Sequence, residues 1–224
     1  MNSTWLLIFD CDGVLVDSEI LAIRAEERVL AEIGMAMTAD EIADTCVGLS
    51  YPSMMALLEE RFGRPVPEGF EERIQIEAKS NFEAELTEVH GIGDLLEASS
   101  LARCVASSGT PDRIALSLNV TGLVDHFDRE AIFSAVQVEN GKPAPDLFLL
   151  AAQQMGFEPH RCIVIEDSPF GIQAARSAGM TAIGLTSASH LRPSSAGKLI
   201  DSGAHHIAST ATELEEIIGG IVDG

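Results

Sequence analysis

The sequence is poor in positive charge: 14 Lys and Arg residues stand against 35 Asp and Glu residues, a formal net charge of −21. Nucleic acids and anionic membrane surfaces are bound through clustered Lys and Arg, so we expect neither as a partner. No run of about 18 apolar residues occurs, and no charged and then apolar leader with a small-residue cleavage site opens the chain. We therefore expect a soluble, cytoplasmic protein.

The sequence also lacks paired cysteines. Its four cysteines are far apart and show no C-x-x-C spacing: Cys11, Cys46, Cys104 and Cys162. Neither a disulfide framework nor a zinc site is indicated. Internal repeats and low-complexity tracts are also missing. With 224 residues, the chain can form one large domain or a main domain with a smaller insert.

Short apolar runs separated by helical segments are what the chain does contain, and they are typical of βαβ units with a parallel sheet. The expected strands are Trp5–Phe9 and residues 103–107, 132–136, 162–165 and 180–184. Thr110 and Ser168 are helix-capping residues before two of the helical segments between these strands. Thr210 caps the last helix in the same way. The fold class is therefore α/β, with a Rossmann-like parallel sheet.

Residues 16–87 interrupt this pattern, because they contain four consecutive helical patterns and no strand. The capping box Thr38-x-x-Glu41 predicts the start of one of the four helices. Four helices in a row do not form a single crossover between neighbouring strands. We therefore expect 16–87 to be a small helical domain inserted into a core made of 1–15 and 88–224.

Two carboxylates directly follow the first apolar run, in Asp10-Cys11-Asp12-Gly13. Ligands of open parallel sheets bind outside the carboxyl ends of the strands, so Asp10 and Asp12 are expected to project into a crevice. Such a pair needs a cation or a shared proton, and Gly13 lets the chain turn close to a ligand. An ordinary acidic turn is the alternative. A calcium EF-hand loop is excluded, since it requires Gly at its sixth position and Glu at its twelfth.

Three further groups follow later strands. Ser107 and Ser108 precede a helix N-terminus and form a candidate anion site, although a plain turn fits them equally well. Lys142 is fixed between glycine and proline residues, where the alternative is a solvent-exposed lysine. Glu166 and Asp167 close the buried run before Ser168, where acids can simply cap a helix.

In their order and spacing, Asp10-x-Asp12-Gly13, Ser107, Lys142-Pro143 and Glu166-Asp167 resemble the four motifs of the haloacid dehalogenase-like superfamily, whose members are mostly phosphohydrolases. The resemblance spans nearly the whole chain. It includes a helical cap inserted after the first motif, as in the branch of β-phosphoglucomutase and the sugar phosphatases. It implies a cap that covers the crevice and a small phosphorylated metabolite, such as a sugar phosphate, as the substrate.

The resemblance also implies roles for the residues. Asp10 would attack phosphorus, and Asp12 would protonate the leaving alcohol and then activate water. Mg²⁺ would be bound by Asp10, by the backbone carbonyl of Asp12 and by Asp167, with Glu166 behind them. Phosphate would be bound and its charge stabilised by the remaining motif residues: Gly13, Ser107, Ser108 and Lys142.

Other activities on the same fold are disfavoured, and a phosphosugar mutase is the nearest alternative. Haloacid dehalogenases lack an acid where this chain has Asp12, and phosphonate hydrolysis needs a reactive cap lysine, for which only Lys79 is present. A phosphosugar mutase would carry G-x-S-R in a cap loop, whereas this chain reads Gly48-Leu49-Ser50-Tyr51. A non-catalytic binding protein would be expected to have lost a motif residue. A monomer and a homodimer are both compatible with the sequence.

Overall fold

The structure, a computed structural model, describes residues 4–46, 51–191 and 194–224. Within them the chain divides into two compact units, Met1–Asp17 with Thr87–Gly224 and Ser18–Leu86. We call the first unit the core and the second the cap. The cap therefore begins two residues later than the sequence analysis placed it and ends one residue earlier.

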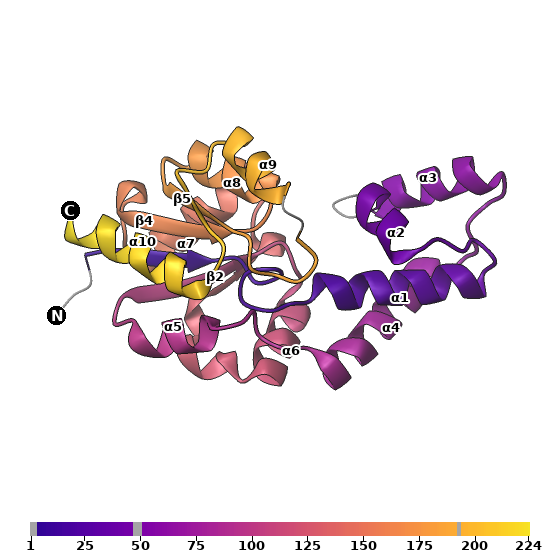
Figure 1. The fold of residues 1–224 in the computed structure, drawn as a ribbon, viewed down its shortest axis with the longest axis horizontal. Coiled ribbons are helices and arrows are strands. Elements are labelled where there is room, and N and C mark those ends of the chain that lie inside the picture. The colour runs from indigo at the N-terminus through magenta and orange to yellow at the C-terminus, as the bar shows by residue number, and fades with distance from the viewer. Residues whose placement is uncertain (1–3, 47–50, 192–193) are drawn as a thin grey trace. The chain divides into compact units, whose positions relative to one another are not determined.

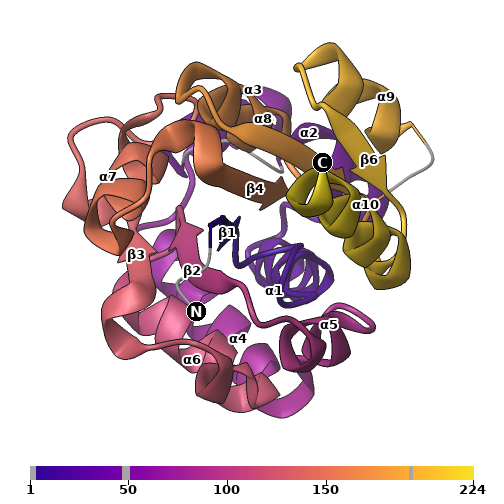
Figure 2. The ribbon, with the colours of Figure 1, turned by 90° about the vertical axis from the view of Figure 1, so that its left-hand side faces the viewer.

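One parallel sheet of six strands forms the centre of the core, in the order β3-β2-β1-β4-β5-β6 (Figure 2). The strands are β1 Leu6–Phe9, β2 Ala102–Ser107, β3 Ile132–Ser134, β4 Cys162–Glu166, β5 Thr181–Leu185 and β6 His206–Ala208. The chain runs outward from β1 to β3, then resumes beside β1 at β4 and runs outward to β6. Ligands of such sheets bind where the strand order reverses, which here is at the carboxyl ends of β1 and β4.

Helices cover both faces of this sheet (Figures 1 and 2). One face carries α7 Asp146–Met155, α8 Pro169–Ser177 and α9 Ser195–Asp201, and the other carries α5 Ile92–Ala98, α6 Pro111–Thr121 and α10 Ala211–Asp223. All four residues of β1 are fully buried as a result. A strand buried on both faces reads as a continuous apolar run, which explains the pattern seen in the sequence. The expected α/β fold is confirmed.

Three of the expected helix caps form in the core. The side chains of Thr110, Ser168 and Thr210 each accept a hydrogen bond from a backbone amide of the first helical turn. These caps satisfy donors that have no partner inside the helix. They fix where α6, α8 and α10 begin, and the first two begin directly after the strands β2 and β4.

The predicted strands were wrong in two places. The run 132–136 stops being a strand at Ser134, whose Oγ accepts from the Val136 amide and starts a 3₁₀ turn, η3 Ala135–Gln137. The edge strand β6 was missed, because three residues are too few for an alternating pattern. Three further 3₁₀ turns lie in the core: η1 Leu123–His126, η2 Arg129–Ala131 and η4 Pro159–Arg161.

The described residues of the cap form four helices: α1 Glu19–Glu32, α2 Ala39–Thr45, α3 Tyr51–Phe62 and α4 Phe70–Glu85. Helix α1 packs along α4. The interior of the cap is a hydrophobic cluster that includes Leu30, Met35 and Leu58 and is separate from the cluster of the core. The capping box of Thr38 and Glu41 is present at the start of α2. Its own hydrophobic cluster makes the cap a compact unit.

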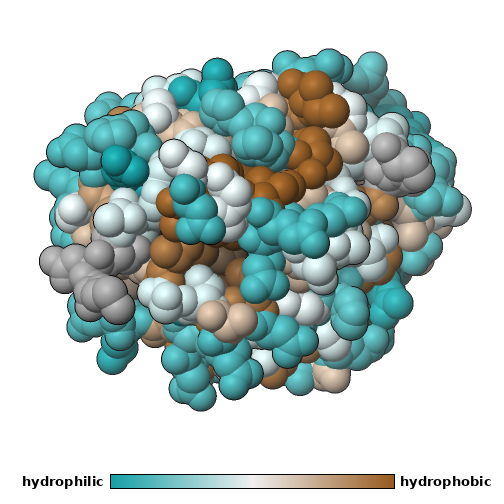
Figure 3. Space-filling model, turned by 60° about the vertical axis from the view of Figure 1, so that its left-hand side comes forward, coloured by the Kyte–Doolittle hydropathy of each residue, from teal (hydrophilic) through white to brown (hydrophobic). Residues whose placement is uncertain are grey.

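The face of the protein shown in Figure 3 is mainly hydrophilic. On the face shown in Figure 3, hydrophobic residues gather in a band across the middle and hydrophilic residues surround it. Among the described residues, no helix has both the length and the apolar character needed to cross a membrane.

Candidate active site

Asp10 lies at the point where β1 ends, and its amide extends the pairing of the sheet by donating to the carbonyl of Ile165 in β4 (3.0 Å). The Nζ atom of Lys142 lies 2.6 Å from Asp10 Oδ1 and 2.6 Å from Glu166 Oε1. The same ammonium donates to the carbonyl of Ala106 (3.1 Å). Its side chain is only 5% exposed. Three motifs that are far apart in the sequence therefore meet at one buried ammonium group.

This cluster contains more negative than positive charge. Burial raises the pKa of Asp10 to about 7, because the negative charges of Glu166 and Asp12 add to the desolvation and Lys142 offsets only part of it. Burial lowers the pKa of Lys142, but the two adjacent carboxylates raise it by more, so Lys142 is charged. The site is thus suited to take up further positive charge.

Oxygen atoms of Asp10, Glu166 and Asp167 lie within 4.8 Å of one another. Hard cations such as Mg²⁺ prefer oxygen ligands of this kind, so the donor set fits the ion that the sequence implied. The two Glu166 oxygens are already engaged: Oε1 by Lys142, and Oε2 by the amides of Asp167 and Ser168 and by the Ser168 hydroxyl. Asp10 and Asp167 are therefore the better candidates for direct ligands, and Glu166 holds Lys142 and the start of α8.

Gly13 meets a steric requirement. It has a φ of +77°, and a Cβ atom built on it would lie 1.9 Å from Asp167 Oδ2. Its amide donates to the carbonyl of Val16 (2.8 Å). Because that amide is already bonded, the phosphate contact expected from Gly13 has no support in the geometry. The residue serves the site by leaving room for the Asp167 carboxylate.

The loop after β2 places the two expected serines differently. Ser107 is 1% exposed, and its Oγ accepts from the Gly109 amide (3.1 Å), whereas Ser108 is exposed. The loop is also held by Ser134, whose hydroxyl donates to the Gly109 carbonyl (2.6 Å). Ser107 thus lies at the carboxyl end of β2, next to Ala106, whose carbonyl accepts a hydrogen bond from Lys142. Ser134 was missed by the sequence analysis, which assigned it to the middle of a strand.

Two further side chains reach the site without having been predicted. Arg113 Nη2 lies 2.9 Å from Asp12 Oδ1, and His190 Nε2 lies 3.5 Å from Asp167 Oδ2. Burial lowers the pKa of His190. Arg113 stands in the first turn of α6 after the cap Thr110, and His190 follows β5. Both positions are at the carboxyl edge of the sheet, which is the one signal that could have identified them.

Comparison with known proteins supports the motif-based prediction. The family profile for haloacid dehalogenase-like hydrolases matches residues 7–185. The chain belongs to this family.

Several relatives of the chain are named as phosphatases. The 6-phosphogluconate phosphatase of Escherichia coli is 28% identical over 86% of this chain and 87% of its own. The phosphorylated carbohydrates phosphatase of Thermotoga maritima is 34% identical over 79% of this chain and 82% of its own. Among solved structures, a HAD family hydrolase from Deinococcus radiodurans with bound phosphate and sodium is 32% identical, with a TM-score of 0.84, over 96% of this chain and 95% of its own.

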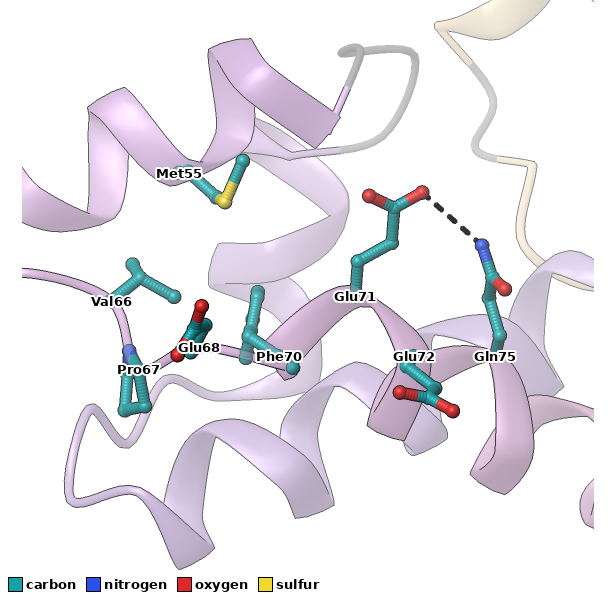
Figure 4. A pocket seen from close by; sticks show the side chains of 9 residues that line it. Met55, Val66, Pro67, Glu68, Phe70, Glu71, Glu72 and Gln75 are labelled. Atoms are coloured by element: carbon teal, nitrogen blue, oxygen red, sulfur yellow. Dashed lines mark hydrogen bonds between the residues drawn. The ribbon is translucent and has the colours of Figure 1, made fainter.

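The cap of this haloacid dehalogenase-like hydrolase contains a hollow of its own, of about 440 Å³, beside the start of α4 (Figure 4). Glu68, Glu71 and Glu72 line it, together with the apolar side chains of Met55, Val66 and Phe70. In Figure 4 Glu71 accepts a hydrogen bond from Gln75 (3.2 Å). No lysine or arginine is among the described residues that line it, so it lacks the charge that a phosphate would need.

Proposed function

We propose that this protein is a Mg²⁺-dependent phosphatase that hydrolyses a small phosphomonoester, such as a sugar phosphate or a related phosphorylated polyol or acid. The observation that carries the proposal is the position of Asp10: a buried carboxylate at a strand end, bonded to Lys142 and within 4.8 Å of two more carboxylates. The phosphatase names of the relatives support the same reaction.

In the first step, an Asp10 oxygen attacks phosphorus, and the bond from phosphorus to the leaving alcohol breaks. Asp12 gives its proton to the departing oxygen. In the second step, Asp12 takes a proton from water while that water attacks the aspartyl phosphate. Inorganic phosphate leaves, and Asp10 is again a free carboxylate.

The other residues of the site stabilise charge. Lys142 and Ser107 would hold the phosphoryl oxygens, on which negative charge builds up as the transition state forms. Asp10, Asp167 and the backbone carbonyl of Asp12 would bind Mg²⁺, whose charge lets an anionic carboxylate approach an anionic phosphate. Glu166 keeps Lys142 in place through its 2.6 Å ion pair.

A phosphosugar mutase is the alternative reaction. The cap loop on which the sequence comparison rested, Gly48 to Ser50, lies outside the described residues. The cap holds 15 acidic residues but only six basic ones. Each of the six is bonded to a carboxylate or carbonyl of the cap itself: Arg24, Arg28, Arg61, Arg64, Arg73 and Lys79. A cap cation would have to leave its present partner to bind a second phosphate, so hydrolysis is favoured.

Two assays test the proposal. Phosphate release from a panel of sugar and polyol phosphates should require Mg²⁺, should stop with a chelator, and should be abolished by Asp10→Asn. A folded Asp10→Asn variant that keeps substantial turnover would refute the mechanism. With β-glucose 1-phosphate, phosphate released should match substrate consumed, whereas isomerisation to glucose 6-phosphate without phosphate release would establish the mutase instead.

A further inference from the structure

Arg113 is the exposed cation of the site. Its Nη2 atom donates to Asp12 Oδ1 (2.9 Å), and its side chain is 37% exposed, whereas the side chain of Lys142 is 5% exposed. Lys142 is held between Asp10 and Glu166 and faces the transferred phosphoryl group in the proposed reaction. Arg113 is bonded instead to the residue that meets the leaving alcohol.

The backbone of Arg113 is fixed by the loop that follows β2. Its amide donates to the Thr110 hydroxyl (3.4 Å), and Thr110 with Pro111 sets the first turn of α6. Its Cδ atom would lie 3.8 Å from a Cβ placed on Gly109, so the aliphatic stem runs beside the loop that carries Ser107. Ser134 holds the same loop through the Gly109 carbonyl. These contacts fix the position of the Arg113 guanidinium relative to the loop that carries Ser107.

The contact with Asp12 limits how far Arg113 lies from the substrate. In the proposed reaction, the leaving oxygen forms a hydrogen bond to the Asp12 carboxylate, which also accepts from Arg113. Two hydrogen bonds of about 2.8 Å to one carboxylate place a guanidinium nitrogen within about 6 Å of the leaving oxygen when they share one carboxylate oxygen, and within about 7 Å when they use both oxygens. An oxygen substituent on the neighbouring carbon of the alcohol can then lie within hydrogen-bond distance of the guanidinium. Its fork of donors suits a hydroxyl or a carboxylate.

The ion pair between Arg113 and Asp12 should contribute little to the stability of the fold. Ion pairs between partly exposed side chains contribute little to folding, since water screens them. Replacing Arg113 should therefore leave the protein folded, which makes the residue suitable for a kinetic test.

We propose that Arg113 is a substrate-recognition residue, which binds an oxygen substituent on the carbon next to the phosphorylated carbon of the leaving alcohol. The proposal rests on the phosphatase function given above and narrows the substrate class. Vicinally oxygenated alcohols, such as polyols, sugars and hydroxy acids, should be preferred over plain alkyl phosphates of the same length.

The test compares matched substrates: propyl phosphate, glycerol 3-phosphate, which adds two hydroxyl groups, and 3-phosphoglycerate, which keeps the hydroxyl on the neighbouring carbon and has a carboxylate in place of the terminal hydroxymethyl group. A fourth substrate, p-nitrophenyl phosphate, has a leaving group that needs no proton. The values of kcat/KM are measured for wild type, Arg113→Met, Arg113→Lys and the control Arg161→Met. Arg161 lies over the Trp5 ring just before β4 begins, at the opposite edge of the sheet.

Arg113→Met should lower kcat/KM for glycerol 3-phosphate by about 10- to 100-fold, the range of a hydrogen bond to a charged group. Propyl phosphate and p-nitrophenyl phosphate should change by less than about threefold, and Arg113→Lys should restore part of the loss. The Arg161→Met variant should match wild type. The losses should be equal for glycerol 3-phosphate and 3-phosphoglycerate, which share the hydroxyl on the neighbouring carbon. A larger loss for 3-phosphoglycerate would place the bound group one carbon further away and would contradict the proposal.

Two results would overturn the inference while the phosphatase function stands. If Arg113→Met lowers kcat/KM equally for glycerol 3-phosphate and propyl phosphate but spares p-nitrophenyl phosphate, Arg113 only positions Asp12. If all substrates keep their wild-type values, Arg113 has no part in recognition. A wild-type protein that releases phosphate from none of the four substrates, nor from the sugar phosphate panel, would instead refute the proposed function and, with it, the role of Arg113.

Discussion

Replacing Lys142 by methionine should lower the stability of the protein, because it removes the cation shared by two buried carboxylates. Lys142 is buried and lies 2.6 Å from both Asp10 and Glu166. Methionine fills most of the same space but leaves two buried carboxylates without their common cation. Removing one partner of a buried ion pair costs about 3 to 5 kcal/mol. In a protein of this size each 1 kcal/mol lowers Tm by about 2 to 4 °C, so a fall of about 6 to 20 °C is expected.

The effect should depend on pH in a defined direction. The carboxylate of Asp10 takes up a proton more readily once the ammonium is gone, and its protonation removes the repulsion between the two carboxylates. The destabilisation by Lys142→Met should therefore be largest at about pH 8 and smaller at about pH 5. Adding Glu166→Gln should recover part of the stability, because it removes one of the two unpaired charges.

Thermal unfolding of the metal-free protein, followed by circular dichroism, measures these changes. The matched control is Lys79→Met, because Lys79 is 61% exposed and paired with Glu83 one helical turn away. Exposed pairs of this kind contribute about 0.3 to 0.5 kcal/mol, so its Tm should shift by less than about 2 °C. If Lys142→Met shifts Tm no more than Lys79→Met does, the account of Lys142 as the central cation of the site is wrong.

Three further predictions concern the metal. Asp167→Asn should weaken Mg²⁺ binding in calorimetry more than Glu166→Gln does, because the Glu166 oxygens are engaged by protein donors; the reverse order would exchange their roles. Mg²⁺ affinity should rise with pH and level off above about pH 7, because Mg²⁺ competes with the proton on Asp10, whose pKa is raised to about 7. Equal affinities at about pH 5.5 and about pH 8 would contradict this prediction. Gly13→Ala should abolish measurable Mg²⁺ binding, because a Cβ would lie 1.9 Å from Asp167 Oδ2, and an alanine variant that binds normally would refute the steric argument.

Much of the site could be predicted because its chemistry is local to strand ends. Asp10, Ser107 and Glu166 each lie at the end of an apolar run or directly after it, and parallel strands bring such ends to one edge. Proline and capping signals, as at Ser168, marked where the next helix begins. The structure places these groups together as the sequence led us to expect.

The remainder depends on contacts that sequence spacing does not encode. Arg113 and Asp12 are separated by 101 positions, and which way an arginine side chain extends from a helix is set by its three-dimensional neighbours. The close approach of Gly13 to Asp167 depends on such contacts too: the two residues are far apart in the sequence, and the space that Gly13 leaves for the Asp167 carboxylate is visible only in the fold. The end of β3 at Ser134 reflects a side-chain cap that an apolar pattern conceals.

In the proposed mechanism, Asp10 carries the phosphoryl group during turnover. Enzyme mixed with a good substrate and Mg²⁺ can be quenched in acid within milliseconds and analysed by peptide mass spectrometry, since acyl phosphates survive acid better than base. The peptide with Asp10 should gain the mass of one phosphoryl group, and Asp10→Asn should abolish this species. A phosphorylated residue other than Asp10, or full turnover with no phosphorylated peptide at any quench time, would contradict this mechanism.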